Sequence, residues 1–335
     1  MATVREIARL ANVSISTVSY VLNNSPNVSG ETRQKVLRIA QELDYNIQAQ
    51  RRGDKIKKKE GVIGLFVSNF NGSYSLNLVE EMFLCAYFDH MRSLHVHIEP
   101  KISSREFSSQ LLSSGVQSAI ILHNTLPDEC VYKLKDCGIP MVFLDREIVD
   151  NKISFVLVDN YNGMCQQVEY LIKTGHKRIG YMKGNDRYDD RKRYLAYIDT
   201  MKKHSMPIDE SLIWSGCYNY LDAKYSLINA YPEMKSVPDA ICCSNDDMAL
   251  GCIDGLEESG FSVPRDISVC GFDDLYLSST YKIPLTTVIN PVRTIAKTAV
   301  GEAVRLLSPE AKGQAQFIRA EFVVRKSSAV RNGSR

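Results

Sequence analysis

Residues 3–46 read TVREIARLANVSISTVSYVLNNSPNVSGETRQKVLRIAQELDYN, and this stretch decides the fold of the first part of the chain. Apolar residues recur at helical spacing in three segments, 4–11, 15–23 and 30–43. Each segment follows a hydroxyl-bearing residue that is suited to cap a helix: Thr3, Ser14 and Ser29. Two short helices joined by a three-residue turn, with a third helix across them, predict a helix-turn-helix unit.

The outer face of the second segment carries small polar side chains where a surface helix usually carries glutamate and lysine. The face is formed by Ile15, Ser16, Thr17, Ser19, Tyr20 and Asn23, of which Ser16, Thr17, Ser19 and Asn23 bear the small hydroxyl and amide groups. Hydroxyl and amide groups form hydrogen bonds with phosphates and base edges, and they do not repel the phosphate backbone. Any small three-helix bundle has the same apolar pattern, so it is this face that favours DNA binding.

The charge is distributed unevenly along the chain. Residues 1–60 contain 11 Lys/Arg and 6 Asp/Glu, whereas the other residues contain 30 Lys/Arg and 33 Asp/Glu. The first part is therefore basic, with a net charge of +5, and the rest is mildly acidic, at −3. A small basic domain joined to a larger acidic one indicates a polyanionic partner for the first part.

Over residues 3–46 the sequence resembles the headpiece of the LacI family of bacterial repressors. The resemblance implies that a recognition helix lies in the major groove of operator DNA, with Ile15, Ser16 and Tyr20 as its base readers. It also implies phosphate and framework contacts from Thr3, Ser14, Thr17, Ser19, Asn23, Val28, Ser29, Thr32 and Tyr45. Tyr20 replaces the arginine of the best-known members, so their operator sequence is not expected here.

The linker 47–60 departs from the family pattern, in which Pro-Asn follows the tyrosine and a hinge helix presents a leucine to the minor groove. Here the proline position holds Ile47 and the leucine position holds Asp54, and a carboxylate cannot act as an apolar wedge between base pairs. Gly53 weakens any helix there, and Ile56 in the wedge position is the alternative. Basic side chains remain for the phosphates: Arg51, Arg52, Lys55, Lys57, Lys58 and Lys59. We therefore expect DNA binding with steep salt dependence and modest DNA bending.

From Gly61 onward, apolar strand-like runs alternate with helical stretches, which predicts an α/β core with two doubly wound parallel sheets. In such sheets, ligands bind beyond the carboxyl ends of the strands. Carboxylate, amide, guanidinium and aromatic side chains recur at or just beyond these ends: Tyr74, Asp145, Arg146, Arg191, Tyr218, Asn245, Asp246 and Asp273. Together they suit a carbohydrate or nucleoside pocket, whereas loop polarity alone explains any one of them.

Four segments of this region resemble the periplasmic-binding-protein-like core of the same family: VDNYNGMCQQVEYLIKTGHKRIGYMKG, PDAICCSNDDMALG, VPRDISVCGFDDL and PLTTVINPV. The resemblance implies that Asp145, Arg191, Asn245 and Asp273 contact a small effector between two lobes. It places Tyr218 at a position where a stacking aromatic residue is common, and Tyr74 in a loop that often adds another. It also implies that the chain crosses between the lobes three times.

These observations predict an all-α helix-turn-helix headpiece at 1–46, a basic linker at 47–60 and a two-lobed α/β core. We expect the N-terminal lobe at 61–159 plus 288–309, the C-terminal lobe at 160–287 plus 315–325, and a polar tail at 326–335. No leucine heptad follows Val324, so a homodimer is expected and not a tetramer held by a coiled coil.

A catalytic function is the alternative to a binding function. Adjacent carboxylates occur at Asp246/Asp247 and Asp273/Asp274, but neighbouring side chains in a turn usually point apart and do not flank one scissile bond. No nucleophile-elbow, phosphate-loop or zinc-protease motif occurs. His95 and His97 offer at most two ligands on one face, so neither a metal nor a cofactor is expected.

The composition, with 44% apolar and 24% charged residues, is that of a soluble globular protein. No long apolar run and no export signal occur, and the nine cysteines are scattered as reduced thiols are, so we expect a cytoplasmic protein that does not bind membranes. The expected function is repression of a carbohydrate-utilisation operon under control of a sugar. A purine-responsive regulator, or a soluble sugar-binding protein of the same architecture, is the alternative.

Overall fold

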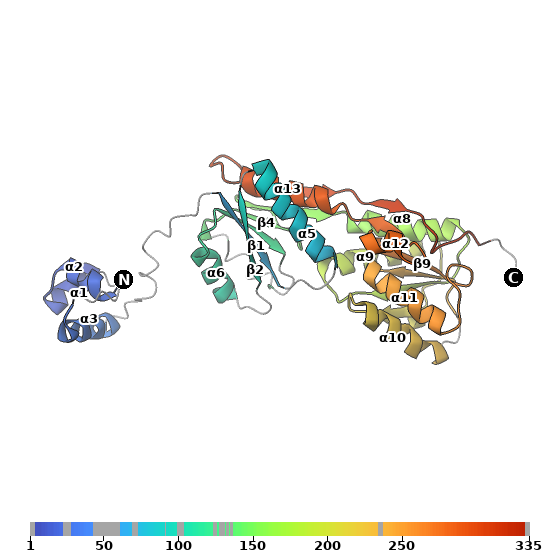
Figure 1. Ribbon diagram of the computed structural model, residues 1–335, viewed down its shortest axis with the longest axis horizontal. Coiled ribbons are helices and arrows are strands. Elements are labelled where there is room, and N and C mark those ends of the chain that lie inside the picture. The colour runs from blue at the N-terminus through green and yellow to red at the C-terminus, as the bar shows by residue number, and fades with distance from the viewer. Residues whose placement is uncertain are drawn as a thin grey trace. The chain divides into compact units, whose positions relative to one another are not determined.

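The computed structural model describes residues 4–22, 28–42, 61–68, 73–90, 92–98, 104–122, 126, 131, 134, 137–233 and 237–331. The chain divides into two compact units, a headpiece within Met1–Lys59 and a core that contains nearly all residues from Glu60 to Arg335 (Figure 1). The linker 47–60, with its two arginines and the altered wedge position, lies outside the described residues.

The headpiece consists of three helices, α1 (Val4–Ala11), α2 (Ile15–Leu22) and α3 (Gly30–Glu42). Their apolar stripes meet in one small core: Ile7, Ala8, Ala11, Val18, Val21, Val36, Ile39 and Ala40. Ser14 accepts a hydrogen bond from the amide of Thr17 at 3.0 Å, and Ser29 accepts one from the amide of Thr32 at 3.3 Å. These two side chains cap α2 and α3, because the first amides of a helix have no carbonyl partner.

The N-terminal lobe is built on a six-stranded sheet in the order β11-β5-β4-β3-β1-β2, and all its neighbouring strands are parallel. The strands are β1 (Val62–Val67), β2 (Ser93–Ile98), β3 (Ser118–Leu122), β4 (Met141–Phe143), β5 (Ile153–Val158) and β11 (Ala315–Ile318). Helices α5 (Ser73–Leu84) and α13 (Val292–Arg305) pack on one face, and α6 (Ser104–Ser113) packs on the other (Figure 1). A π-helical turn, Cys85–Asp89, continues α5.

The C-terminal lobe is built on a second six-stranded sheet, in the order β12-β10-β9-β8-β6-β7. Its strands are β6 (Ile179–Lys183), β7 (Ile213–Ser215), β8 (Ala240–Cys243), β9 (Ser268–Asp273), β10 (Thr286–Ile289) and β12 (Glu321–Val323), and only β12 runs antiparallel to its neighbour. One face is covered by α8 (Asn160–Lys173) and α9 (Tyr188–Lys203). The other is covered by α10 (Tyr220–Ala230) and α11 (Asp246–Glu258), and α12 (Tyr276–Thr280) follows β9.

The chain crosses between the lobes after β5, after β10 and between β11 and β12. Two expected boundaries differ from the structure. The segment 315–325 is divided, because β11 pairs with β5 in the N-terminal lobe and only β12 joins the second sheet. Residues 288–289 belong to β10 and pair with β9, so the chain returns to the first lobe only after Ile289.

The end of the described chain is not a free polar tail. The amide of Lys326 donates to the carbonyl of Pro284 at 2.9 Å, and the amide of Arg331 donates to the carbonyl of Thr174 at 2.8 Å. Ser327 is fully buried and donates to the carbonyl of Val269 at 2.6 Å. Residues 326–331 therefore belong to the C-terminal lobe, because their backbone hydrogen bonds are made there.

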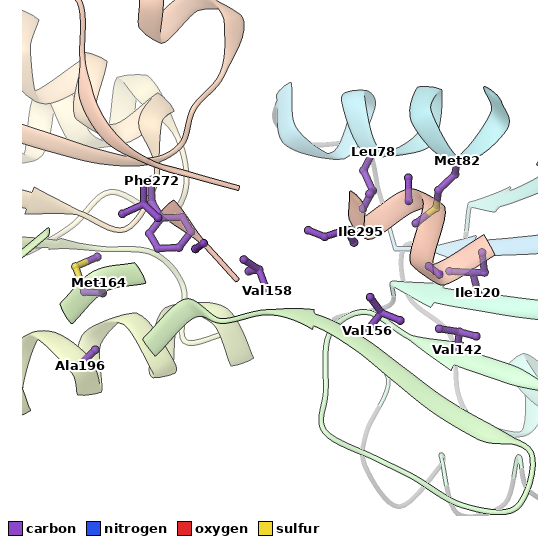
Figure 2. Close-up of a cluster of buried hydrophobic side chains, with 14 of the residues drawn as sticks. Leu78, Met82, Ile120, Val142, Val156, Val158, Met164, Ala196, Phe272 and Ile295 are labelled. Atoms are coloured by element: carbon purple, nitrogen blue, oxygen red, sulfur yellow. The ribbon is translucent and has the colours of Figure 1, made fainter. Parts of the chain in front are cut away.

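One apolar cluster continues from the first lobe into the second. Figure 2 shows Val158 and Ile295 between Phe272 of the C-terminal lobe and the N-terminal side chains that surround Val156. Val158 ends β5 and Ile295 lies in the first turns of α13, so both belong to crossing segments. The shared cluster therefore joins the two lobes into one compact unit.

No helix in the described part of the chain is long and apolar enough to span a membrane.

Candidate functional site

A cavity of about 110 Å³ lies between the two lobes of the core. The N-terminal lobe contributes the start of α5 and the ends of β3, β4 and β5, and the C-terminal lobe contributes the loop before α9 and the residues that follow β7 to β10. The polar lining side chains are Tyr74, Ser75, Asp145, Asn160, Arg187, Tyr188, Asp189, Arg193, Tyr218, Asn245, Asp247, Asp273 and Asn290. The cavity therefore lies where parallel sheets are expected to bind ligands.

Arg193 is the buried cation of the cavity, with 3% of its surface exposed. Its Nε donates to Oδ1 of Asn160 at 2.8 Å, and its guanidinium also donates to the carbonyl of Ser244. The same group lies 3.6 Å from Oδ1 of Asp273 and 3.6 Å from the centre of the Phe272 ring. These contacts fix the guanidinium in one orientation beside the carboxylate that ends β9.

Asp273 has an unusual backbone and an unusual acidity. Its φ of 121° lies in the region that favours glycine, and such strained residues cluster at binding sites. Burial raises the pKa of its carboxyl group to about 7, although Arg193 and a hydrogen bond from Asn290 at 3.1 Å both favour the charged form. The carboxylate is thus poised to change its proton occupancy when a ligand contributes or removes a hydrogen bond.

This acidity predicts a pH dependence of stability. The folded chain binds the Asp273 proton more tightly than the unfolded chain, whose carboxyl titrates near 3.8, so the unfolding free energy falls as the pH rises toward about 7. Asp273 should contribute a slope of roughly 1 kcal/mol per pH unit between pH 5 and 7, because one pKa unit corresponds to about 1.4 kcal/mol, and the buried Asp246, whose pKa is raised to about 6, adds to the slope below pH 6. Urea unfolding at several pH values measures it. Asp273→Asn is expected to flatten the slope, and an unchanged slope in this variant would contradict the assignment.

Three tyrosines line the cavity, and Tyr74 and Tyr218 supply aromatic surface from opposite lobes beside Tyr188. Tyr74 lies in the first turn of α5 and is half-buried. Tyr218 follows β7 with a φ of 59°, and its hydroxyl donates to Asp189 at 2.5 Å. A Cβ atom on Gly184 would lie 2.3 Å from the Tyr218 ring, so this glycine makes room for it. Such rings can cover the apolar face of a sugar or stack on a base.

The structure brings together Tyr74, Asp145, Tyr218, Asn245 and Asp273, all of which line the cavity. Arg146 does not line it, but its Nε and terminal nitrogen hold the two carboxylate oxygens of Asp145 at 3.2 and 3.1 Å. Asn245 also caps α11 by accepting from the amide of Met248 at 3.0 Å.

Arg191 and Asp246 were predicted to contact the effector, but neither side chain lines the cavity. Arg191 is exposed and donates to the carbonyl of Asp186 at 2.6 Å, outside the cavity. Asp189 and Arg193 stand four residues apart on one face of α9, and a residue halfway between them points to the opposite face. Helical periodicity, applied from the correct start of α9, was the signal that could have selected Arg193.

Asp246 is fully buried beside the cavity and organises the loops around it. Its carboxylate accepts from the hydroxyls of Ser278 at 2.6 Å and Thr287 at 2.5 Å, and from the amide of Leu275 at 2.9 Å. Its neighbour Asp247 lines the cavity instead. Five further lining residues were not predicted, and they come from three separate segments of the chain: Asn160, Arg187 to Asp189, and Asn290.

In the headpiece, α2 presents the residues that were predicted to read bases. Ile15 and Tyr20 are each 52% exposed, Ser16 is exposed and Thr17 is half-buried. The other predicted contacts have local roles: Ser14 and Ser29 cap helices, Thr32 accepts from Ser29 at 2.8 Å, and Val28 packs against the headpiece core. Thr3, Asn23, Tyr45, Arg51, Arg52 and the side chain of Ser19 lie outside the described residues.

A three-helix unit with an exposed second helix, followed by a two-lobed core with a polar cavity, defines the architecture of a helix-turn-helix DNA-binding regulator. The comparisons with known proteins agree. Residues 3–47 match the model for bacterial regulatory proteins of the lacI family, and residues 168–328 match the periplasmic binding protein-like domain.

The chain is 30% identical to the probable HTH-type transcriptional repressor ExuR of Bacillus subtilis (strain 168), over 98% of both chains. It is 29% identical to the HTH-type transcriptional repressor PurR of Mannheimia succiniciproducens, again over 98% of both. Among solved structures it is similar to the Lac repressor dimer bound to operator and the anti-inducer ONPF, with 26% identity, 98% and 99% coverage and a TM-score of 0.71. The chain belongs to the LacI family; it is a DNA-binding transcriptional repressor and not an enzyme.

Proposed function

We propose that this repressor controls a carbohydrate-utilisation operon, and that a sugar of about one ring, bound between the lobes, sets its affinity for operator DNA. The observation that carries the proposal is the cavity wall. Four carboxylates can accept from hydroxyl groups: Asp145, Asp189, Asp247 and Asp273. Arg187 and Arg193 can donate, and Tyr74 and Tyr218 offer apolar surface to the faces of a ring. Polyhydroxylated ligands satisfy this excess of acceptors.

A purine is the second candidate. Tyr74 and Tyr218 can also stack on a base, and Asn160, Asn245 and Asn290 offer paired amide donors and acceptors. Several relatives of similar length carry the name PurR, which supports this candidate. The number of lining carboxylates favours the sugar, because a purine has few groups that donate to them.

We further propose that α2 lies in the major groove of the operator, with Ile15, Ser16 and Tyr20 toward the bases. A homodimer would present two such helices to a two-fold-related operator. Exposed apolar side chains on α5 and the turn after it support a dimer through this face: Leu76, Phe83, Leu84, Tyr87 and Phe88. The similar Lac repressor structure is also a dimer. A monomeric mass in sedimentation at micromolar concentration would contradict it. Because its target is chromosomal DNA, we place the repressor in the cytoplasm.

The decisive experiment is a gel-shift series on a DNA fragment selected from a random double-stranded library by the full chain. Monosaccharides, disaccharides, hypoxanthine and guanine are added singly, and each is also tested for a shift in melting temperature. We expect one class of compound to change both the DNA affinity and the melting temperature. A chain without residues 1–60 should bind the same compound but should no longer bind the DNA fragment. If it retains full DNA affinity, or if no compound acts, the proposal fails.

A further inference from the structure

Tyr188 lies on a helix of the C-terminal lobe, but its side chain packs against the N-terminal lobe. It is the first residue of α9 in the C-terminal lobe, yet its ring packs against the apolar cluster of the N-terminal lobe that includes Phe66, Phe143 and Phe155. The same residue lines the cavity. Tyr188 therefore touches both lobes and the space between them.

Glu147 holds Tyr188 in this place. It lies in the loop after β4, two residues beyond Asp145, and its Oε1 accepts from the Tyr188 hydroxyl at 2.5 Å. The Lys192 ammonium, one turn along α9, lies 2.9 Å from the same oxygen and 5.4 Å from the centre of the Tyr188 ring. The bond from Tyr188, and then that from Lys192, lowers the pKa of Glu147, so this clamp of Glu147, Tyr188 and Lys192 is charged at neutral pH.

The clamp acts on the helix that carries the ligand-facing groups. Asp189 follows Tyr188 directly, and Arg193 lies just over one turn further along α9. Arg193 in turn contacts Asn160, Ser244 and Asp273, which lie on three other elements of the cavity wall. Because a helix moves as a rigid rod, fixing its first turn against the N-terminal lobe fixes these groups relative to Asp145 and Tyr74 across the cavity.

We propose that Glu147 is a positioning residue, which holds Tyr188 and the first turn of α9 against the N-terminal lobe and so keeps the effector cavity closed. The proposal rests on the proposed sensor function of the cavity. It adds a specific contact that couples closure of the lobes to ligand binding in the cavity. A ligand between the lobes and the clamp would both stabilise the closed arrangement of the two lobes, so each would favour the other.

An incidental surface ion pair is the competing explanation. The side chains of Lys192 and Glu147 are 39% and 42% exposed, and exposed pairs contribute little because water and salt screen them. The hydrogen bond from the Tyr188 hydroxyl differs from this ion pair. The Tyr188 ring is packed against the N-terminal lobe, and the Glu147 carboxylate that accepts the bond is charged. The clamp therefore predicts that Tyr188→Phe and Glu147→Ala have large effects and that Lys192→Met has a small one.

The first test needs no effector. Hydrogen exchange is measured on the full chain for peptides that cover Arg187–Tyr197. We expect the amides of Arg191 to Leu195 to exchange about threefold to tenfold faster in Glu147→Ala and Tyr188→Phe, the loss expected for one charge-assisted hydrogen bond. Glu147→Gln keeps an acceptor and should restore most of the protection. Glu258→Ala is the matched control, because Glu258 also pairs with a lysine, Lys224, at 2.6 Å but lies outside the cavity. Exchange as in the unsubstituted chain in both Glu147→Ala and Tyr188→Phe overturns the proposal.

The second test uses the compound that the sugar and purine screen identifies. Its dissociation rate should rise about threefold to tenfold in Glu147→Ala and Tyr188→Phe, should stay near the original value in Glu147→Gln, and should not rise further in the double variant. Faster exchange with an unchanged dissociation rate would show a structural contact without a positioning role, and would overturn the proposal. If no compound binds, the sensor function fails, while the exchange experiment still decides whether the clamp holds α9.

Discussion

Arg193→Met is expected to lower the unfolding free energy at pH 7 by about 3 kcal/mol, the usual cost of removing one partner of a buried ion pair. The variant leaves the Asp273 carboxylate buried without its cation and leaves the Asn160 and Ser244 oxygens without their donor. The loss should be smaller at pH 5, where Asp273, with a pKa near 7, is protonated. Urea unfolding followed by the fluorescence of Trp214, the single tryptophan, measures both values.

The chain offers a matched control two residues away. Arg191→Met removes an equally long cation from the exposed face of α9, so it should change stability by no more than about 0.5 kcal/mol and leave effector binding intact. The double variant Arg193→Met with Asp273→Asn should recover part of the lost stability, because it removes the unpaired charge. Equal losses in the two single arginine variants would disprove the role given to Arg193.

Ser16→Glu is expected to weaken binding to selected DNA by about a hundredfold. Ser16 is exposed on α2, so a carboxylate there would face the phosphates and replace a group that can bond a base edge. Tyr20→Ala should weaken binding by about 1–3 kcal/mol, the range for one base contact, and should also relax the sequence preference. Gel shifts at one fixed salt concentration measure the affinities, and repeated selection from the random library measures the preference.

Gln34→Glu is the control for added negative charge. Gln34 is also exposed, but it lies on α3, away from the face of α2 that carries Ser16. Circular dichroism should show the same helix content in all three variants, since none of the substituted side chains is buried. If Gln34→Glu weakens binding as much as Ser16→Glu does, the effect is one of net charge and α2 is not the reading helix.

The fold was predictable because its signals are periodic. Ile7, Ala8 and Ala11 repeat at helical spacing and form the headpiece core, and the prediction of this unit is confirmed. In the first sheet Ile63 and Leu65 face one apolar cluster and Val62 and Phe66 face the other, as alternation along a strand covered on both faces requires. Each of these patterns reflects which side chains are buried, and it can be recognised from residues that are close together in the sequence.

The parts that were mispredicted depend on neighbours that are distant in sequence. Whether Arg191 or Arg193 enters the cavity depends on where α9 begins, and the loop before α9 is held by Asp190, which accepts from the amides of Gly184 and Asp186. The division of 315–325 depends on β5 and β10, since β11 and β12 are both short and partly exposed. No local pattern distinguishes such alternatives.

The two lobes are joined by three crossings and one shared apolar cluster, whereas the headpiece is continuous in sequence and has its own core. Genetic exchange between related genes can therefore replace the headpiece at a single junction and leave the sensor intact. Exchange of one lobe would require three simultaneous junctions and a rematched cluster around Val158 and Ile295. In this architecture the headpiece can be exchanged as one module and the whole core as another, whereas neither lobe of the core can be exchanged alone without disturbing the shared cluster.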